Sequence, residues 1–211
     1  SMDIFNRFFA GISMEEIDTF PLLPLGCWLL PIGVWLLAVG FCLGMDRKNR
    51  RFAVIRYGGM QKWWKHYFFK NMIYGGLAAG MLPLAGWLAE LLVLRHLRGS
   101  IPETAEVFAL WIVHGMALLA LYLFLDTTRM KRIIPAMLLI LEGMTFLYGY
   151  RNKKAAPFMF GIWGMYRQSS FYDRIGGFPV LCMVALQIAI IAGCYLLGIY
   201  CLKRKEAEGV Q

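Results

Sequence analysis

Residues 20–45 read FPLLPLGCWLLPIGVWLLAVGFCLGM, a stretch of 26 residues without a charged side chain. A transmembrane helix needs about 20 consecutive apolar residues to cross a hydrocarbon core of about 30 Å. The whole chain has 211 residues, of which 59% are hydrophobic and 17% charged, whereas a typical soluble domain has about 25% charged residues. The stretch therefore predicts an integral membrane protein and argues against a soluble globular domain.

Four further apolar stretches are read in the same way, because backbone amides in hydrocarbon must find their hydrogen bonds inside their own helix. The predicted spans are residues 20–45, 69–94, 107–125, 133–150 and 179–202. Together they predict an all-α transmembrane domain over residues 20–202, with about five helices. The first stretch is too long for a signal-peptide core, so we expect it to stay in the mature protein.

The Lys and Arg residues select an orientation, since five spans place the two termini on opposite sides of the membrane. If the N-terminus is outside, the cytoplasmic segments 46–70, 126–132 and 203–211 hold 14 of the 22 basic residues. This bias predicts an N-out, C-in topology. It also accounts for the net charge of +9 without a nucleic-acid partner. Residues 1–19 become an external segment able to form a short interfacial helix, and residues 203–211 a basic cytoplasmic tail.

The sequence lacks the patterns of common catalytic and metal sites. The five cysteines and three histidines match no metal-ligand spacing, and neither a GxxxxGK[ST] phosphate loop nor a GxSxG elbow occurs. We therefore expect no catalytic residue, no metal and no cofactor bound by this chain.

Three polar side chains nevertheless fall within the predicted spans. An ionised group near the bilayer centre is costly, so such residues usually face a partner helix or a water-filled pathway. Glu142 fits either substrate-pathway or inter-helix pairing, and His114 fits a hydrogen-bonded packing residue or a pathway residue. Glu90, near the outer end of its span, can snorkel to the interface, pair with Arg95 or line a pathway.

Residues 46–70 read DRKNRRFAVIRYGGMQKWWKHYFFK and carry eight basic residues. Met60, Trp63, Trp64 and Tyr67 have the spacing of one helix face, which predicts an amphipathic cytoplasmic helix entering the second span. One interpretation is an interfacial anchor, with tryptophans at the headgroup level and lysines on anionic lipid. The other is a docking element for a cytoplasmic partner.

Two strings in the chain resemble a known family. Arg56-Tyr57-Gly58-Gly59-Met60-Gln61-Lys62-Trp63-Trp64 resembles a signature of small permease subunits of type-two ABC exporters, in the Firmicute group related to bacteriocin-immunity and antibiotic-efflux permeases. Residues 157–178, which include Gly161-Ile162-Trp163-Gly164-Met165-Tyr166-Arg167 and Gly176-Gly177-Phe178, are similar to the outer segment that precedes the last span in that group.

The resemblance implies a coupling helix within residues 46–66 that sits in a groove of a cytoplasmic ATP-binding subunit. The partner-binding residues would be Arg56, Tyr57, Gly58, Gly59, Lys62, Trp63, Trp64 and Lys65. Residues 151–178 would form a re-entrant or hairpin element on the outer face, with Trp163, Tyr166 and Arg167. The chain departs from the family in having five spans instead of six, with the first one missing, and in carrying Gly59 where a hydroxyl residue is expected.

The function implied is that of a non-catalytic permease subunit in a bacterial plasma membrane. It would pair with a second permease subunit, of the same or a related chain, contact membrane lipid, and rely on ATP and Mg²⁺ bound by the partner ATPase. The substrate would be amphipathic, such as a peptide antibiotic or a lipid. Two alternatives remain: a membrane scaffold that uses residues 46–70 to bind a partner or anionic lipid, and a membrane enzyme that uses Glu142 and His114.

Overall fold

The chain folds into long helices, and the computed structural model describes residues 4–13, 21–94, 101–128 and 133–207. The α-helices are α1 (Ile4–Phe9), α2 (Leu22–Lys48), α3 (Arg50–Tyr57), α4 (Met60–Leu94), α5 (Ile101–Asp126), α6 (Ile134–Arg151) and α7 (Val180–Ala207). Short 3-10 turns, η1 (Ala156–Phe158), η2 (Phe160–Ile162) and η3 (Tyr166–Gln168), lie between α6 and α7. The predicted all-α class is confirmed.

Within the described residues, α2, α4, α5 and α7 are long and apolar enough to cross a membrane. They coincide with four of the predicted spans, so the chain is a multi-pass membrane protein. The fifth stretch forms α6, which has 18 residues, carries Glu142 near its middle and is not among those four helices. Its crossing of the membrane and the N-out, C-in orientation stay predictions.

Parts of several predicted segments lie outside the described residues. These are residues 1–3 and 14–19 of the N-terminal segment, 95–100 with Arg95 and His96, 129–132 of the cytoplasmic turn and 208–211 of the basic tail. The proposed pairing of Glu90 with Arg95 therefore falls outside the described part of the chain.

The helix α4 joins two elements that the sequence suggested separately. Its 35 residues include both the amphipathic stretch that begins at Met60 and the predicted span 69–94. At 1.5 Å per residue such a helix is about 50 Å long, well beyond a hydrocarbon core of about 30 Å. The first turns of α4 therefore extend past the apolar part of the bundle.

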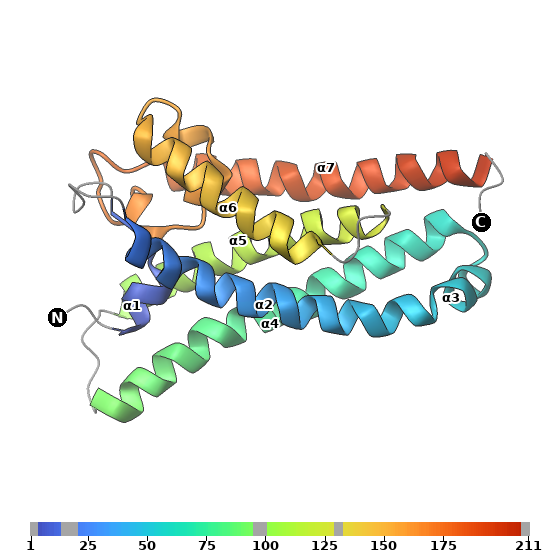
Figure 1. The fold of residues 1–211 in the computed structure, drawn as a ribbon, viewed down its shortest axis with the longest axis horizontal. Helices are drawn as coiled ribbons and strands as arrows, with labels where there is room; N and C mark the ends of the chain where they lie inside the picture. Colours follow the sequence, from blue (N-terminus) through green and yellow to red (C-terminus); the bar gives the residue numbers. More distant parts are fainter. Residues whose placement is uncertain (1–3, 14–20, 95–100, 129–132, 208–211) are drawn as a thin grey trace.

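The long helices run along one axis of the molecule, and its two ends differ (Figure 1). One end carries α3, the start of α4 and the C-terminal end of α7. The other carries α1 and the irregular segment between α6 and α7. The helix α6 is shorter than its neighbours and ends where the irregular segment begins, beside the start of α7.

The helix α5 is the centre of the bundle. In its most apolar window 61% of the residues are buried, compared with 11% in α4 and 17% in α7. Small residues let α4 come close to it, since Gly76 lies against Met116 and Gly80 against Ile112 of α5. The Gly76-x-x-x-Gly80 pair therefore serves packing inside the chain.

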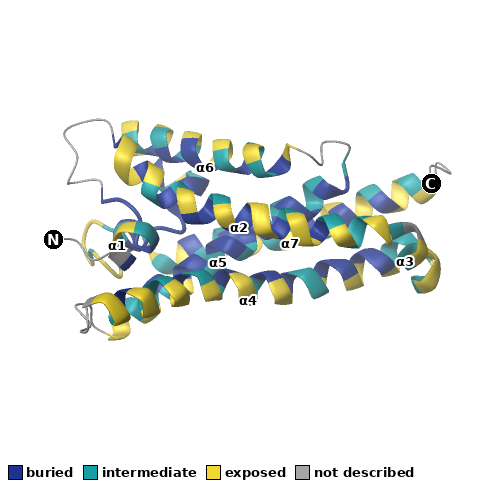
Figure 2. Cartoon of the chain, turned by 60° about the horizontal axis from the view of Figure 1, so that its bottom comes forward, coloured by how far each residue is buried: buried dark blue, intermediate teal, exposed yellow. Residues whose placement is uncertain are grey.

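The outer sides of the bundle are apolar. Figure 2 shows exposed residues along the outer sides of α4 and α6, while α5 is largely buried. Exposed side chains include Leu37 and Phe41 on α2, Ile73 and Leu77 on α4 and Leu181 on α7. Surfaces of this extent are unfavourable in water, and a lipid environment removes that cost.

Candidate functional site

Four helices each direct one polar side chain to a single point inside the bundle. Glu142 of α6 accepts hydrogen bonds at Oε1 from Trp28 Nε1 of α2 at 2.9 Å, and the same oxygen lies 3.1 Å from His114 Nε2 of α5. His114 Nδ1 lies 3.1 Å from Gln187 Oε1 of α7. All four side chains are at most 1% exposed. We call Trp28, His114, Glu142 and Gln187 the polar centre.

The polar centre brings together two of the three residues that the sequence singled out within the spans. Glu142 of α6 and His114 of α5 contact each other directly, so in the structure Glu142 pairs with a neighbouring helix. Glu142 Oε2 is buried and has no hydrogen-bond partner among the described residues. Trp28 and Gln187 were not predicted as site residues, although Gln187 is the single amide side chain in the stretch 179–202, which is a signal for it.

An irregular segment closes one side of the polar centre. Residues 160–169 are buried except for the half-buried Arg167, and we call them the inserted segment. Its carbonyl oxygen at Trp163 accepts a hydrogen bond from Gln187 Nε2 at 3.2 Å, and the Phe160 ring lies 4.9 Å from the His114 ring. Non-helical backbone is tolerated at membrane depth only where protein or a water-filled cavity surrounds it.

Two glycines allow the inserted segment to approach the helices. A Cβ atom on Gly161 would overlap the carbonyl oxygen of Glu142, and one on Gly164 would come within 2.5 Å of His114 Cγ. The Gly161 amide donates to Thr145 Oγ1 at 2.9 Å, which satisfies one of the buried backbone groups.

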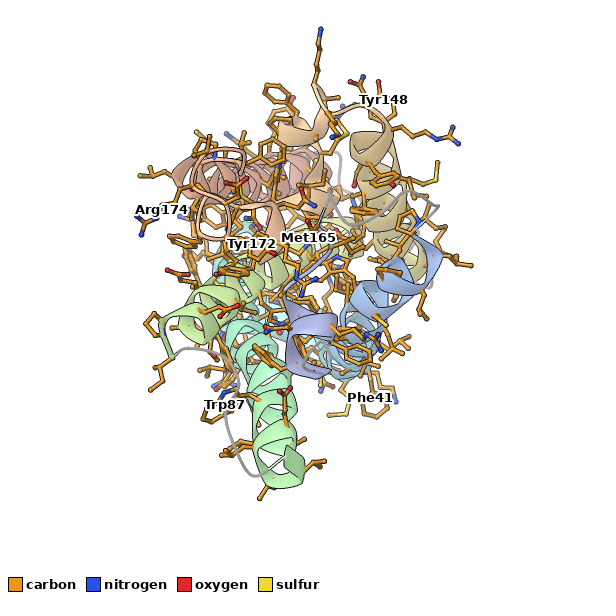
Figure 3. All side chains as sticks on the ribbon, turned by 90° about the vertical axis from the view of Figure 1, so that its left-hand side faces the viewer. Phe41, Trp87, Tyr148, Met165, Tyr172 and Arg174 are labelled. Atoms are coloured by element: carbon orange, nitrogen blue, oxygen red, sulfur yellow. The ribbon has the colours of Figure 1, made fainter. Side chains whose placement is uncertain are left out.

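The three residues predicted for the outer element lie in or beside this inserted segment. Trp163 is 7% and Tyr166 6% exposed, and Arg167 donates its backbone N–H to the carbonyl oxygen of Ala10 at 3.0 Å. Burial near Glu103 and Glu106 raises the pKa of Tyr166 to about 12, so its hydroxyl stays neutral at physiological pH. Figure 3 looks onto this end of the molecule and places Met165 near its middle, with Phe41, Trp87 and Tyr148 at the periphery.

Glu90 lies away from the polar centre. Its Oε2 accepts the backbone N–H of Phe5 at 2.6 Å, so the carboxylate satisfies an amide at the start of α1. Phe5 stacks on Phe108 of α5, and Phe9 packs edge-on against Trp111. Glu90 therefore holds α1 on the bundle.

The predicted partner-binding segment forms α3, a turn and the start of α4. Gly58 (φ 70°) and Gly59 (φ 137°) adopt backbone conformations that favour glycine and end α3. Arg56, Lys62 and Lys65 are exposed. Tyr57 is half-buried and stacks on His66 with ring centroids 4.7 Å apart.

The tryptophans of this segment are directed into the bundle. Trp64 is 0% exposed and donates from Nε1 to the carbonyl oxygen of Tyr195 in α7 at 3.1 Å. Trp63 is 5% exposed, stacks on Tyr67 and lies under the guanidinium of Arg50 at 4.5 Å. The face of α4 that the spacing predicted exists, and it packs against the chain's own helices.

Charged residues join neighbouring helices at the end of the bundle that carries α3. Arg47 of α2 pairs with Asp126 at the end of α5, and Tyr67 of α4 donates to Asp126 Oδ2 at 3.3 Å. Glu206 of α7 accepts the backbone N–H of Met60. These contacts of Asp126 and Glu206 were not predicted from the sequence, because they depend on which helices are neighbours.

Across residues 4–13, 21–94, 101–128 and 133–207, no group of three or more His, Cys, Asp or Glu side chains is placed to hold a metal ion. The polar centre places an imidazole and a carboxyl group, the side-chain types used in general acid–base chemistry, within hydrogen-bond distance of each other.

Comparison of the chain with protein-family models, with curated proteins and with solved structures finds no match.

Proposed function

We propose that the chain is the membrane-spanning permease subunit of an ATP-driven exporter of the ABC type. In this proposal α3 and the first turns of α4 dock onto a cytoplasmic ATP-binding subunit, which binds ATP and Mg²⁺ and performs the hydrolysis. The chain itself is not an enzyme. The resemblance of residues 56–64 to the permease signature motivates the proposal, and the shape of the α3–α4 element supports it.

The observation that carries the proposal is that the α3–α4 element is exposed on one side and firmly attached on the other. Arg56, Lys62 and Lys65 are exposed, and Phe52 and Ile55 are 76% and 77% exposed. Such a mixture of apolar and basic side chains suits a groove on another protein.

The attachment of this element reaches three other helices. Trp64 is bonded to α7, while Tyr67 joins α4 to Asp126 of α5 and thereby to Arg47 of α2. A displacement of α3 by a partner would therefore move the long helices as packed bodies, as alternating access requires. The energy would come from the different affinities of the two arrangements for the partner and its nucleotide.

The remaining parts of the proposal concern the substrate and the second subunit. An amphipathic substrate, such as a peptide antibiotic or a lipid, fits a bundle with apolar outer surfaces. The exposed apolar sides of α4 and α7 leave room for lipid and for a second permease subunit.

The test is purification of the chain from its native host, in detergent or nanodiscs, with any co-purifying ATP-binding subunit identified by mass spectrometry. We expect the wild-type pair to co-purify, and the variant Arg56→Glu/Lys62→Glu/Lys65→Glu to bind at least about tenfold more weakly, because charge reversal at a docking surface opposes association. The matched control, Lys153→Glu/Lys154→Glu, reverses exposed charges at the opposite end and should bind like the wild type. Equal binding of both variants would overturn the proposal.

The exposed Phe52 and Ile55 beside basic residues also favour a second candidate, a scaffold that binds anionic lipid. In that case the triple variant would retain less anionic lipid after purification, as measured by native mass spectrometry, and no ATPase would co-purify with the wild type.

A further inference from the structure

The hydrogen bonds around Gln187 fix one proton of His114. Gln187 Nε2 lies 3.2 Å from the carbonyl oxygen of Trp163 and 3.1 Å from that of Met183. Both partners are acceptors, so this atom is the amide nitrogen and Oε1 is the oxygen that faces His114 Nδ1. An oxygen of this kind can only accept, and therefore Nδ1 carries a hydrogen.

The contact on the other side of the ring then contains a single proton. His114 Nε2 and Glu142 Oε1 are 3.1 Å apart, which is a hydrogen-bond distance. Either the imidazole is a cation that donates to a carboxylate, or the carboxyl is neutral and donates to Nε2. Both forms are neutral overall and hold one proton between the two residues.

The surroundings favour the neutral carboxyl. Glu142 Oε2 has no partner among the described residues, and a bare carboxylate oxygen without a donor is far more costly to bury than a carbonyl oxygen. The other groups that contact the pair are uncharged: Trp28 on α2, Gln187 on α7, and Phe160 with Gly164 on the inserted segment.

The geometry points to a proton-binding site made by His114 and Glu142, whose occupancy controls the docking of the inserted segment. The site takes a proton from water and releases it to water, and the bond that breaks on release is the O–H bond of Glu142, whose electron pair stays on the carboxylate. This inference goes beyond the proposed function, because it concerns the chain alone and needs no ATPase.

Loss of the shared proton changes the hydrogen bonds in a defined order. A carboxylate oxygen and the lone pair of Nε2 would face each other and repel. The ring can relieve this by carrying its hydrogen on Nε2, but Nδ1 then faces Gln187 Oε1 without a hydrogen. The side-chain amide of Gln187 then loses its hydrogen bond to His114. The hydrogen bond from Gln187 Nε2 to the Trp163 carbonyl oxygen weakens as a result. We therefore expect the inserted segment to loosen as the pH rises.

The first measurement is a titration of ¹⁵N-histidine signals of the full-length protein in nanodiscs from about pH 5 to about pH 10. His114→Gln identifies the His114 signals among those of the three histidines. We expect a hydrogen on Nδ1 at low pH and a move of the hydrogen to Nε2 as the pH rises. Signals of His114 that stay unchanged over this range would overturn the inference, whatever the variants do.

The second measurement is amide hydrogen exchange of residues 160–169, corrected for intrinsic base catalysis. In the wild type we expect protection to fall by about tenfold or more across the same range. In Glu142→Gln the side chain at this position can neither gain nor lose a proton, so the corrected protection should be independent of pH. The control Asp46→Asn changes a half-exposed carboxylate that pairs with Lys70 at the opposite end of the bundle, and it should behave like the wild type. If the protection of residues 160–169 depended on pH equally in Glu142→Gln and in the wild type, protonation of this site would not determine whether the inserted segment is docked.

Discussion

At the scale of single residues, Gly164 is a tightly constrained position beside the polar centre. Its Cα lies against the imidazole of His114, and a Cβ there would come within 2.5 Å of the ring. The ring cannot move aside without breaking its hydrogen bonds to Glu142 and Gln187. The lack of a side chain at this position is therefore part of how the polar centre is built.

Gly164→Ala should destabilise the protein by about 1–3 kcal/mol, because overpacking forces shifts in neighbouring groups. The measurement is the thermal unfolding midpoint in detergent. Gly26→Ala is the matched control, since Gly26 has open space around its Cα and alanine is favoured over glycine in a helix by about 1 kcal/mol. A midpoint for Gly164→Ala at or above that of Gly26→Ala would contradict the packing argument.

The spacing of Trp63 and Trp64 predicts a helix face, but it does not predict which surface covers that face. Their helical spacing indicated an amphipathic face, and that face exists. Which surface would cover it was open in the sequence, because a membrane interface, a partner protein and the chain's own helices all accept tryptophan. The carbonyl oxygen of Tyr195 and the close approach of Gly198 come from α7, more than 100 residues away.

At the scale of elements, two ion pairs among the described residues at the end of the bundle that carries α3 differ in their exposure. Arg47 and Asp126 have side chains 22% and 3% exposed, whereas Lys70 and Asp46 have side chains 41% and 37% exposed. The first pair joins α2 to α5, and the second joins α2 to α4.

Asp126→Asn should cost about 1.5–3 kcal/mol in the free energy of unfolding, because the partly buried Arg47 and the buried Tyr67 lose their contacts to a carboxylate. Asp46→Asn should cost at most about 1 kcal/mol, since exposed ion pairs contribute little. Denaturant titration of the two variants in the same detergent measures the difference. Equal losses would mean that Asp126 is not the junction of these helices.

At the scale of the whole molecule, the crossing of the membrane by α6 determines on which sides the two termini lie. The helix runs from the middle of the bundle toward the end where α7 begins (Figure 1). Without its crossing, the N- and C-termini would lie on the same side.

The topology can be tested in a variant without the native cysteines. Lys153→Cys and Lys62→Cys place single thiols at exposed positions at opposite ends of the molecule. With the N-out, C-in orientation, a membrane-impermeant maleimide should label residue 153 in intact cells and residue 62 only after permeabilisation. Labelling of both in intact cells would rule out that orientation.

The membrane class, the long helices and the polar residues within them follow from the amino-acid sequence, because hydrocarbon allows few exceptions to apolar composition and to internal backbone bonding. Which of those residues contact one another follows from the packing of the helices. Glu142 was conspicuous as a charge in an apolar stretch, but its partners come from α2 and α5, and Gln187 joins through His114 from α7. Pairing across helices depends on their rotation and neighbours, which composition and spacing along one helix do not specify.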